Sequence, residues 1–560
     1  GACTSMIRHQ PSPGAGQRPV VCGVEGQFVE LDGVEMYRIS SFDKMPPFLM
    51  SLVSASDHWM YVSSGGALAA GRVEPERSLF PYETDDRLYR AGGRTGPFTL
   101  LRVEDAQDST TLWEPFTGGA GDGSVRRNLY KSLIGDTIVF EEVRADLGLT
   151  FRYRWNTSAE WGLVRTSTLA SNRPSGTTNV RMLDGLRNVM PANVSLGMQQ
   201  SRSTLAEAYR RNEIDPETTM AIYSLEARIT DRAEPAESLH ANIVWSTGLP
   251  DATVVLSADQ VATFRRGLDL TTESLTRGTR ADYLLNATIS LEGDSSRSWL
   301  IVGNGHQSQL DVQECRSRLI ADSDLAETIA ADIRLGSDRL QTLVASADGQ
   351  HCTNDKLTTT HHFANTLFNC MRGGVLIDNG SVPVTDLTRF IEQRNRAVHR
   401  VHSEWLATLG DQIDRQQLLG RAADRGDPDL ERLCHEYIPL AFSRRHGDPS
   451  RPWNMFAINV EDDDGKRSLD YQGNWRDIFQ NWEALCFSFP GYFESVVAKF
   501  VNASTPDGFN PYRVTRDGID WEVEDPDSEW SNIGYWGDHQ IIYLLRLLEG
   551  LNTFDPSALP

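Results

Sequence analysis

The stretch Phe151-Arg-Tyr-Arg-Trp155 alternates aromatic and basic side chains one residue at a time. Because successive side chains of a β-strand point to opposite faces of its sheet, this alternation predicts a strand with one buried face. Runs rich in β-branched and aromatic residues recur on both sides of it, separated by Gly, Asp, Pro and Ser; they are Thr137–Phe140, Met220–Ile229, Ala252–Leu256 and Trp299–Val302. So many strands without helical segments between them predict a large antiparallel β-sandwich over residues 21–310, preceded by a flexible segment at residues 1–20.

The hydrophobic period changes near residue 310. Residues 312–344 carry Leu, Ala, Ile, Arg and Asp at helical spacing and contain no Pro, which predicts a helical linker over residues 311–355. Farther along, apolar residues fall on one helical stripe, with Asp386 as the predicted N-cap; they are Leu387, Phe390, Ile391, Val398, Val401 and Trp405. We therefore expect residues 356–560 to form a mostly helical domain.

The chain has 560 residues, and its 54 Lys and Arg against 77 Asp and Glu leave a net charge of −23. This acidic balance argues against a nucleic-acid partner, which needs a basic face, and favours a neutral substrate. No stretch of about 18 apolar residues occurs, so no membrane-spanning helix is expected. The seven Cys are scattered and form no CxxC pair, which predicts reduced thiols and a cytoplasmic location.

Tryptophan is concentrated toward the C-terminal end of the chain. Six of the 13 Trp fall within residues 451–540, where they are interleaved with charged and amide side chains. Flat aromatic rings stack on the C–H faces of sugar rings, and their polar edges hydrogen-bond hydroxyl groups. The cluster therefore indicates a sugar site, although the same residues would also suit the core of a helical domain.

Three polar segments in this region are candidates for binding. In Tyr471–Glu483, a helix that begins near Trp475 would place Arg476 beside Gln480, and Asp477 beside Asn481. Planar donors and acceptors of this kind suit sugar hydroxyls; the alternative is an ordinary Asp at a helix N-terminus with a solvated Arg.

The second candidate segment, Asp507–Glu522, contains two Asp-Gly pairs and an Asn-Pro pair, which predict turns. It is either a binding loop or a structural hairpin. The third segment, Asn532–Gln540, runs into an apolar helical pattern, and its Asp538 and His539 either clamp a sugar or cap that helix.

We expect neither a cofactor nor a metal. The Gly-rich stretch Gly118–Gly123 lies in the β region and no helical pattern follows it, as a phosphate loop would require. The acidic turn Glu461–Gly465 lacks calcium ligands at the first and last loop positions, and the pair His361-His362 has no further ligands at metal spacing.

Together these features resemble the inverting glycoside phosphorylases of the cellobiose and chitobiose phosphorylase type, within the six-hairpin glycosidase superfamily. Residues Asn474–Asn481 are similar to that family's G-[FY]-R-D-x-L-Q-D segment, and Gly537–Gln540 with the following helix is similar to its S-D-D-x-L-W-L segment. The resemblance implies a multidomain β + α chain: a galactose mutarotase-like β-supersandwich, the helical linker, and at residues 356–560 the first part of an (α/α)6 barrel.

The resemblance also implies the site residues. It assigns binding of the sugar at the −1 position to Arg476, Asp477, Gln480, Asp538 and His539, in a pocket shaped by three aromatic residues, which are Trp475, Tyr535 and Trp536. Asn481 and His539 stand where the family has Asp, so a different sugar or linkage is expected.

The family's general acid lies in a G-D-W-N-D-like motif downstream of these segments, and nothing after residue 541 is similar to it. We therefore expect the chain to be a fragment whose general acid lies beyond residue 560. The weaker candidates within the chain are Asp477, Asp520 and Glu522.

The expected function is inverting cleavage or phosphorolysis of β-glucosidic bonds in neutral oligosaccharides, with inorganic phosphate as co-substrate of a phosphorylase. The alternatives are a glycoside hydrolase of the same fold and a non-catalytic carbohydrate-binding protein. A lyase acting on anionic polysaccharide is disfavoured by the net charge of −23. The expected partner is the oligosaccharide, without nucleic acid or membrane, and a homodimer is a further expectation.

Overall fold

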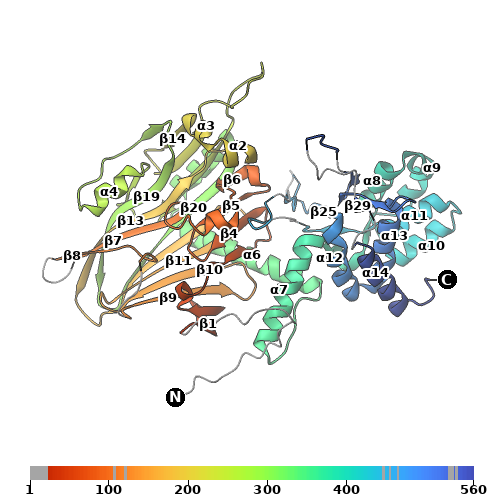
Figure 1. Ribbon diagram of the computed structural model, residues 1–560, viewed down its shortest axis with the longest axis horizontal. Helices are drawn as coiled ribbons and strands as arrows, with labels where there is room; N and C mark the ends of the chain where they lie inside the picture. Colours follow the sequence, from red (N-terminus) through yellow and green to blue (C-terminus); the bar gives the residue numbers. More distant parts are fainter. Residues whose placement is uncertain are drawn as a thin grey trace.

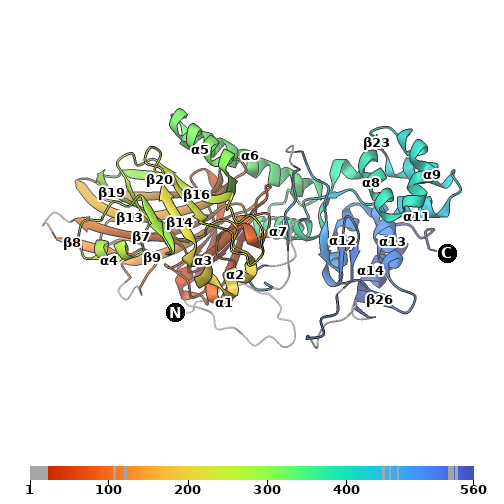
Figure 2. The same ribbon diagram turned by 90° about the horizontal axis from the view of Figure 1, so that it is seen from above.

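The computed structural model describes residues 23–104, 109–118, 123–443, 448–452, 456–462, 466–521, 523–527, 535–536 and 540–559, with the backbone alone for 535–536. Strands gather at one end of the chain and helices at the other, and helix α7 lies between the two groups (Figures 1 and 2). The fold is thus mixed β and α, as the sequence predicts. The predicted flexible segment, residues 1–20, lies outside the described residues.

The largest sheet has 11 strands in the order β1-β2-β9-β10-β11-β12-β20-β16-β15-β14-β18, all paired antiparallel. Its strands in this order are Glu25–Leu31, Val34–Ser40, Val125–Ser132, Ile138–Arg144, Leu149–Ser158, Gly162–Ser171, Ser296–Ser308, His240–Thr247, Ala221–Leu225, Arg210–Ile214 and Leu275–Arg277. The alternating stretch lies in β11, where Phe151, Tyr153 and Trp155 are buried. This confirms the predicted strand and its buried face.

Two further antiparallel sheets complete the β region. The five-stranded sheet has the order β17-β19-β13-β7-β8, with strands Thr253–Val255, Ala281–Glu292, Thr177–Val189, Gly96–Glu104 and Thr110–Trp113. The four-stranded sheet contains β3 Leu49–Leu52, β4 His58–Ser63, β5 Leu68–Arg72 and β6 Ser78–Phe80. Side chains from all three sheets pack into one continuous hydrophobic core.

A buried ion pair joins the two larger sheets inside this core. Arg165 on β12 of the 11-stranded sheet and Asp184 on β13 of the five-stranded sheet are both fully buried, with a shortest N···O distance of 2.9 Å. The Asp184 carboxylate also accepts hydrogen bonds from Thr99 at 2.6 Å and from the Trp299 indole at 2.7 Å. A buried charge is tolerated when it is paired and hydrogen-bonded in this way.

Short helices accompany the β region; they are α1 Asp85–Leu88, α2 Leu196–Ser201, α3 Ser203–Ala208 and α4 Asp259–Arg265, with the 3-10 turns η1 Phe42–Lys44 and η2 Pro75–Arg77. The last strand of the sandwich, β20, ends at Ser308. Helix α5, Gln309–Ala321, begins at the next residue, close to the change of hydrophobic period. Then follow α6 Leu325–Ser346 and α7 Lys356–Gly373.

The helical end of the chain contains α8 Val384–Arg394, α9 Arg396–Ala407, α10 Arg415–Ala423, α11 Pro428–Glu436, α12 Trp475–Ser488, α13 Phe493–Ala503 and α14 Gln540–Phe554. The turns η3 Ile377–Gly380 and η4 Pro490–Tyr492 and short strand pairs connect them. These pairs are β21 Val375–Leu376 with β24 Leu440–Ala441, and β22 Val382–Pro383 with β23 Gln412–Ile413.

The predicted single stripe over residues 387–405 is wrong in one respect. The chain breaks at Asn395, whose side chain caps α9 by accepting from the backbone N–H groups of Ala397 and Val398. The break resets the helical phase, so that Val401 is 71% exposed. The N-cap of α8 is Pro383, and Asp386 instead lies inside the first turn of that helix.

Among the described residues, no helix is long and apolar enough to cross a bilayer. Cysteines in the same part of the chain carry free thiols; they are Cys315, Cys352, Cys370, Cys434 and Cys486.

We predict that Asp184→Ala lowers the free energy of unfolding of the sandwich by about 3–5 kcal/mol, because it leaves the Arg165 guanidinium buried without its counter-charge. The double variant Asp184→Leu with Arg165→Met should recover most of that loss, since it removes both charges. Urea unfolding followed by tryptophan fluorescence measures the difference.

The matched control is Asp269→Ala, which removes a fully exposed carboxylate whose oxygen lies 3.6 Å from the Arg181 guanidinium. Its removal should leave the free energy of unfolding almost unchanged, because solvent screens an exposed pair. Equal costs for Asp184→Ala and Asp269→Ala would contradict a special role for the buried pair.

Candidate functional site

The three polar segments singled out from the sequence are joined by backbone pairing. Strand β25, Gln472–Asn474, leads into α12 and pairs with β27, Arg513–Thr515, which pairs in turn with β28, Ile519–Asp520. Strand β26, Phe509–Asn510, pairs with β29, Tyr535–Trp536. The structure therefore gathers these segments at the N-terminal end of α12, although they are separated in the chain.

The first turn of α12 presents polar side chains to solvent. Arg476 and Gln480 are exposed, and Asp477 is half-buried. Asn481 is buried, and its amide donates to the side-chain oxygen of Asn369 on α7 at 2.9 Å. The predicted face of Arg476 and Gln480 is thus accessible, whereas Asn481 holds α12 against α7.

Asp477 lies within electrostatic reach of two other helices. Burial lowers the pKa of the Arg372 guanidinium on α7. Among the groups that raise this pKa, the Asp477 carboxylate has the largest effect. Burial also raises the pKa of the Tyr543 phenol on α14, and the Asp477 carboxylate raises it further. The Asp477 carboxylate on α12 therefore acts electrostatically on a guanidinium of α7 and a phenol of α14.

A small hollow of about 120 Å³ adjoins this cluster through Arg372. Its other walls include Tyr61 and residues 49–51 of the four-stranded sheet, together with Phe368 and Asp448. The sandwich thus contributes to the surroundings of the helical cluster. Arg372, Tyr543 and Tyr61 could not be predicted from the sequence, because no local motif marks them.

Two Trp of the C-terminal cluster, the candidate Trp475 and Trp482, occupy the helical core. Trp475 is fully buried and packs against Phe479 and Phe500, with ring centroids 4.6 and 5.0 Å apart. Trp482 is also buried, and its indole donates to the Gly373 carbonyl at 2.7 Å. In this conformation neither indole has a free face for a sugar ring.

The remaining predicted residues divide into two groups. Asp520 is half-exposed and accepts a hydrogen bond from Arg513 at 2.9 Å across the β27–β28 pair. Glu522, Asp538 and His539 lie outside the described residues, as do the side chains of Tyr535 and Trp536. Their assignments stay predictions.

Buried polar contacts hold the strand that precedes α12. Lys499 on α13 is 1% exposed and donates to the Tyr471 hydroxyl at 2.8 Å, next to β25. The side chain of Arg516, in the turn after β27, pairs with Asp386 on α8. Asp386 also accepts from the Tyr437 hydroxyl at 2.6 Å. These contacts fix the entry to α12 from both neighbouring elements.

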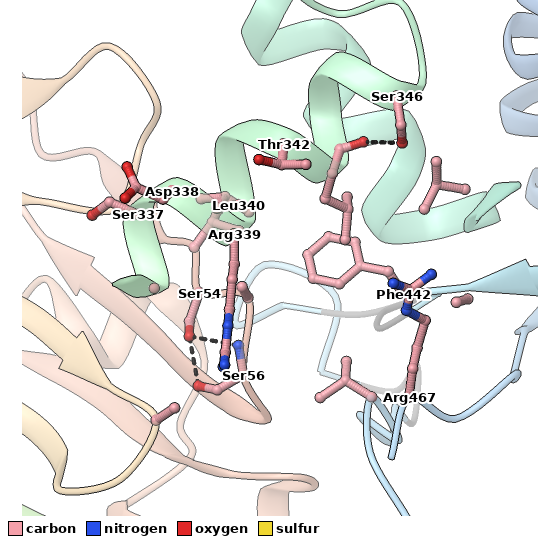
Figure 3. Close-up of a pocket in the computed structure, with 18 of the residues that line it drawn as sticks. Ser54, Ser56, Ser337, Asp338, Arg339, Leu340, Thr342, Ser346, Phe442 and Arg467 are labelled. Carbon is pink, nitrogen blue, oxygen red and sulfur yellow. Dashed lines mark hydrogen bonds between the residues drawn. The ribbon is translucent and has the colours of Figure 1, made fainter. Parts of the chain in front are cut away.

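The structure also contains a larger cavity of about 690 Å³ between the sandwich, α6 and the strand segments near residues 375–379 and 441–467. Arg339 of α6, the hydroxyls of Ser54 and Ser56, and the Phe442 ring lie along its walls (Figure 3). The Ser56 hydroxyl lies 2.6 Å from that of Ser54 and 2.8 Å from Nδ1 of His58.

Backbone strain accompanies this larger cavity. Three of its lining residues, Asp378, Asn379 and Phe442, have φ angles of 46°, 57° and 64°. The left-handed region is costly for a bulky residue such as Phe, and such strain tends to cluster at ligand sites. The cavity shares no lining residue with the Asp477 cluster.

In the described part of the chain, no three His, Cys, Asp or Glu side chains gather closely enough to hold a metal ion.

Comparison with known proteins connects the helical end to carbohydrate enzymes. Residues 378–439, which contain α8 to α11, match the family model of glycoside hydrolase family 149 insertion domain 1. The match covers this short segment of the chain only. A search of curated proteins finds no match to the chain.

Three solved structures illustrate the structural likenesses. A bacterial glucoamylase complexed with acarbose is 9% identical, with a TM-score of 0.32, over 82% of this chain and 60% of that one. A putative kojibiose phosphorylase from the human microbiome is 8% identical, with a TM-score of 0.29, over 63% and 45%. A polysaccharide lyase is 12% identical, with a TM-score of 0.24, over 48% and 34%. The chain spans less than two thirds of the length of each.

We predict that Trp475→Ala lowers the free energy of unfolding by about 3–5 kcal/mol, because it leaves a cavity against Phe479 and Phe500. Trp475→Phe keeps part of that packing and should retain the oligosaccharide affinity of the unchanged protein. Thermal unfolding and isothermal calorimetry measure the two effects. A variant with unchanged stability and lost sugar binding would contradict the core position of the indole.

Proposed function

We propose that this chain belongs to an enzyme that cleaves β-glucosidic bonds of neutral oligosaccharides with inversion, by phosphorolysis with inorganic phosphate as co-substrate. The observation that carries the proposal is the match of residues 378–439 to an insertion domain of a glycoside hydrolase family. The helices of this match pack beside α13, and α12 with its accessible Arg476 and half-buried Asp477 lies in the same part of the fold. Hydrolysis by the same fold is the alternative reaction.

The Asp477 cluster suits the binding of a neutral sugar. An ionised carboxylate accepts hydrogen bonds only, and sugar hydroxyls donate them. Arg476, the residue before Asp477, supplies planar N–H donors. Tyr543 and Arg372 add a phenol and a second guanidinium. Opposite charges near one another give the cluster strong donors and acceptors without a large net charge, which matches a neutral substrate.

The position of the cluster on α12 adds to its capacity for binding. Asp477 lies in the first turn of a 14-residue helix. The backbone N–H groups of this turn have no partner within the helix, and the helix dipole favours negative charge there. We assign Arg476, Asp477 and Gln480 to the −1 sugar. Asp538 and His539 of the third segment would complete this group.

Cleavage with inversion requires a carboxylic acid that protonates the leaving oxygen. Asp520, already paired with Arg513 at 2.9 Å, is suited to a structural role in the β27–β28 hairpin. We therefore propose that Asp520 does not serve as this general acid. A phosphorylase needs in addition an anion site for its co-substrate, and a hydrolase needs a base that activates water.

We predict that Asp477→Asn and Arg476→Gln each weaken the affinity for β-glucan oligosaccharides about 10- to 100-fold. The reason is that each removes charge-assisted hydrogen bonds of about 1.5–3 kcal/mol. Isothermal calorimetry with oligosaccharides of increasing length measures the affinity, and circular dichroism verifies that the variants fold.

The matched control is Asp259→Asn. Asp259 is exposed in the first turn of α4, so its replacement also removes a negative charge from the first turn of a helix, but in the sandwich. Its oligosaccharide affinity should equal that of the unchanged protein. Unchanged affinity in both Asp477→Asn and Arg476→Gln would overturn the assignment of the −1 sugar.

The reaction itself is tested by incubating the protein with β-glucan oligosaccharides, with and without inorganic phosphate. We expect phosphate-dependent release of a sugar 1-phosphate whose anomeric configuration is inverted, as read by nuclear magnetic resonance. Phosphate-independent release of reducing sugar would favour the hydrolase. Binding without either product would favour a non-catalytic carbohydrate-binding protein.

A further inference from the structure

A third cavity lies among the helices. It has a volume of about 110 Å³ and is formed by α8, α11, α13 and the β27–β28 hairpin. Three cationic side chains line it, one from each helix: Arg394, Arg432 and Lys499. The carboxylate of Glu436 is the one acidic group among its lining residues in the described part of the chain. Three positive charges against one negative charge are unusual in a chain with a net charge of −23.

Glu436 compensates these cations incompletely. Its closest donor is the amide of Asn502 at 2.9 Å, whereas Nζ of Lys499 lies at 3.5 Å and the Arg432 guanidinium at 3.9 Å. Arg432 has a second carboxylate, that of Asp429, at 3.8 Å. These ion pairs are long compared with the 2.7–2.9 Å of a good charge-assisted hydrogen bond.

Arg394 is the least compensated of the three cations. Its Nε and Nη2 atoms are buried and have no hydrogen-bond partner among the described residues. Its guanidinium carbon lies 5.3 Å from the centre of the Phe390 ring. This cation–π contact is attractive, but it does not replace a negative charge. Buried polar groups without partners call for an explanation such as a bound ion or water.

The environment of Lys499 strengthens the case for an ion. Lys499 is 1% exposed and Glu436 is 5% exposed, so this end of the cavity has little solvent to screen charge. Like charges brought together in such surroundings repel strongly unless an opposite charge joins them. Water alone supplies hydrogen bonds but no negative charge.

From the balance of charge and the size of the cavity, we propose that this cavity binds a small tetrahedral oxyanion, such as phosphate or sulfate. A water molecule occupies about 30 Å³, so the volume of about 110 Å³ holds roughly three or four waters or one such anion. The guanidinium of Arg394 offers the planar N–H groups that recognise oxyanions with two parallel hydrogen bonds.

The anion would connect two parts of the helical end. Arg394 and Arg432 lie within residues 378–439, the segment that matches the insertion domain, whereas Lys499 lies outside it on α13. A ligand held by both parts stabilises their contact by mass action, because it binds the assembled form and not the separated one. This inference stands independently of the proposed reaction.

The test compares thermal unfolding and calorimetric affinity in phosphate, sulfate and chloride at equal ionic strength. We expect phosphate and sulfate, but not chloride, to raise the midpoint of unfolding. Arg394→Gln should weaken the affinity for phosphate about tenfold or more, because it removes charge-assisted hydrogen bonds. Arg432→Gln, at an exposed side chain, should weaken it less and provides a second variant if Arg394→Gln does not fold.

The matched control is Arg389→Gln on the same helix. Arg389 is 58% exposed and lies 3.6 Å from Asp517, and it does not line the cavity. It should respond to phosphate like the unchanged protein. The proposal is overturned if the unchanged protein shows no difference between phosphate and chloride, or if Arg394→Gln responds to phosphate as Arg389→Gln does.

A further arm separates this site from the proposed sugar site. The effect of phosphate on unfolding should persist in Asp477→Asn and Arg476→Gln, whatever their catalytic activity. If the effect is lost in Arg476→Gln and kept in Arg394→Gln, the anion binds at the α12 cluster and the proposal fails, while the proposed phosphorolysis gains support.

Discussion

The ion pair between Arg165 and Asp184 is the contact on which the arrangement of the two larger sheets depends. The Asp184 carboxylate receives donors from both sheets: Arg165 and Trp299 from the 11-stranded sheet and Thr99 from the five-stranded sheet. Hydrophobic packing alone tolerates small sliding of one sheet over another, because apolar contacts have no direction. The fully buried Asp184 carboxylate restricts such sliding. Movement of one sheet would break its hydrogen bonds and leave its negative charge uncompensated.

The sandwich in turn holds the linker helices. The Ser337 hydroxyl of α6 donates to Asp136 at the β9–β10 turn, and Asp332 of α6 accepts from the backbone N–H of Glu160 at 3.2 Å. Nζ of Lys131 on β9 donates to the carbonyl of Ser51 on β3 at 2.8 Å, beside the hollow that Arg372 shares. Burial lowers the pKa of Lys131 to about 8. The position of α6 thus follows from contacts with the sheets, and α7 joins α6 and Val53 of the sandwich in one hydrophobic cluster.

The surroundings of Asp477 and of Lys499 differ in charge and burial, as the proposed sugar and the proposed anion require. Around Asp477, carboxylate, guanidinium and phenol are mixed, and the side chains are exposed or half-buried. Around Lys499, cations outnumber carboxylates and the deepest groups are almost fully buried. A neutral sugar gains from many hydroxyl contacts of moderate strength, whereas a small anion gains from a few desolvated charges. The same helices can therefore serve both without competition.

Local pattern was sufficient for the strands and for the mixed fold class. The alternation at Phe151–Trp155 predicts β11 and its buried face, because a side-chain period of two has no other regular explanation. The break at Asn395 escaped the periodic analysis, since the apolar spacing continues through it while the capping amide ends one helix and starts the next. The prediction of Asp386 as an N-cap is wrong for a related reason: its partners Tyr437 and Arg516 are distant in sequence.

By itself the sequence determined which segments are strands, where the change to helices occurs, and that Arg476 and Asp477 begin a helix with polar groups on one side. Only the tertiary structure decided which side chains surround them. Helices α7 and α14 pack on α12, which brings Arg372 and Tyr543 within the electrostatic influence of Asp477. Trp475 is directed into the core because its face of α12 meets Phe500 on α13. The physical reason is that a helix's own period fixes which residues share a face, while the energy of burial, summed over all packed elements, selects which face is covered.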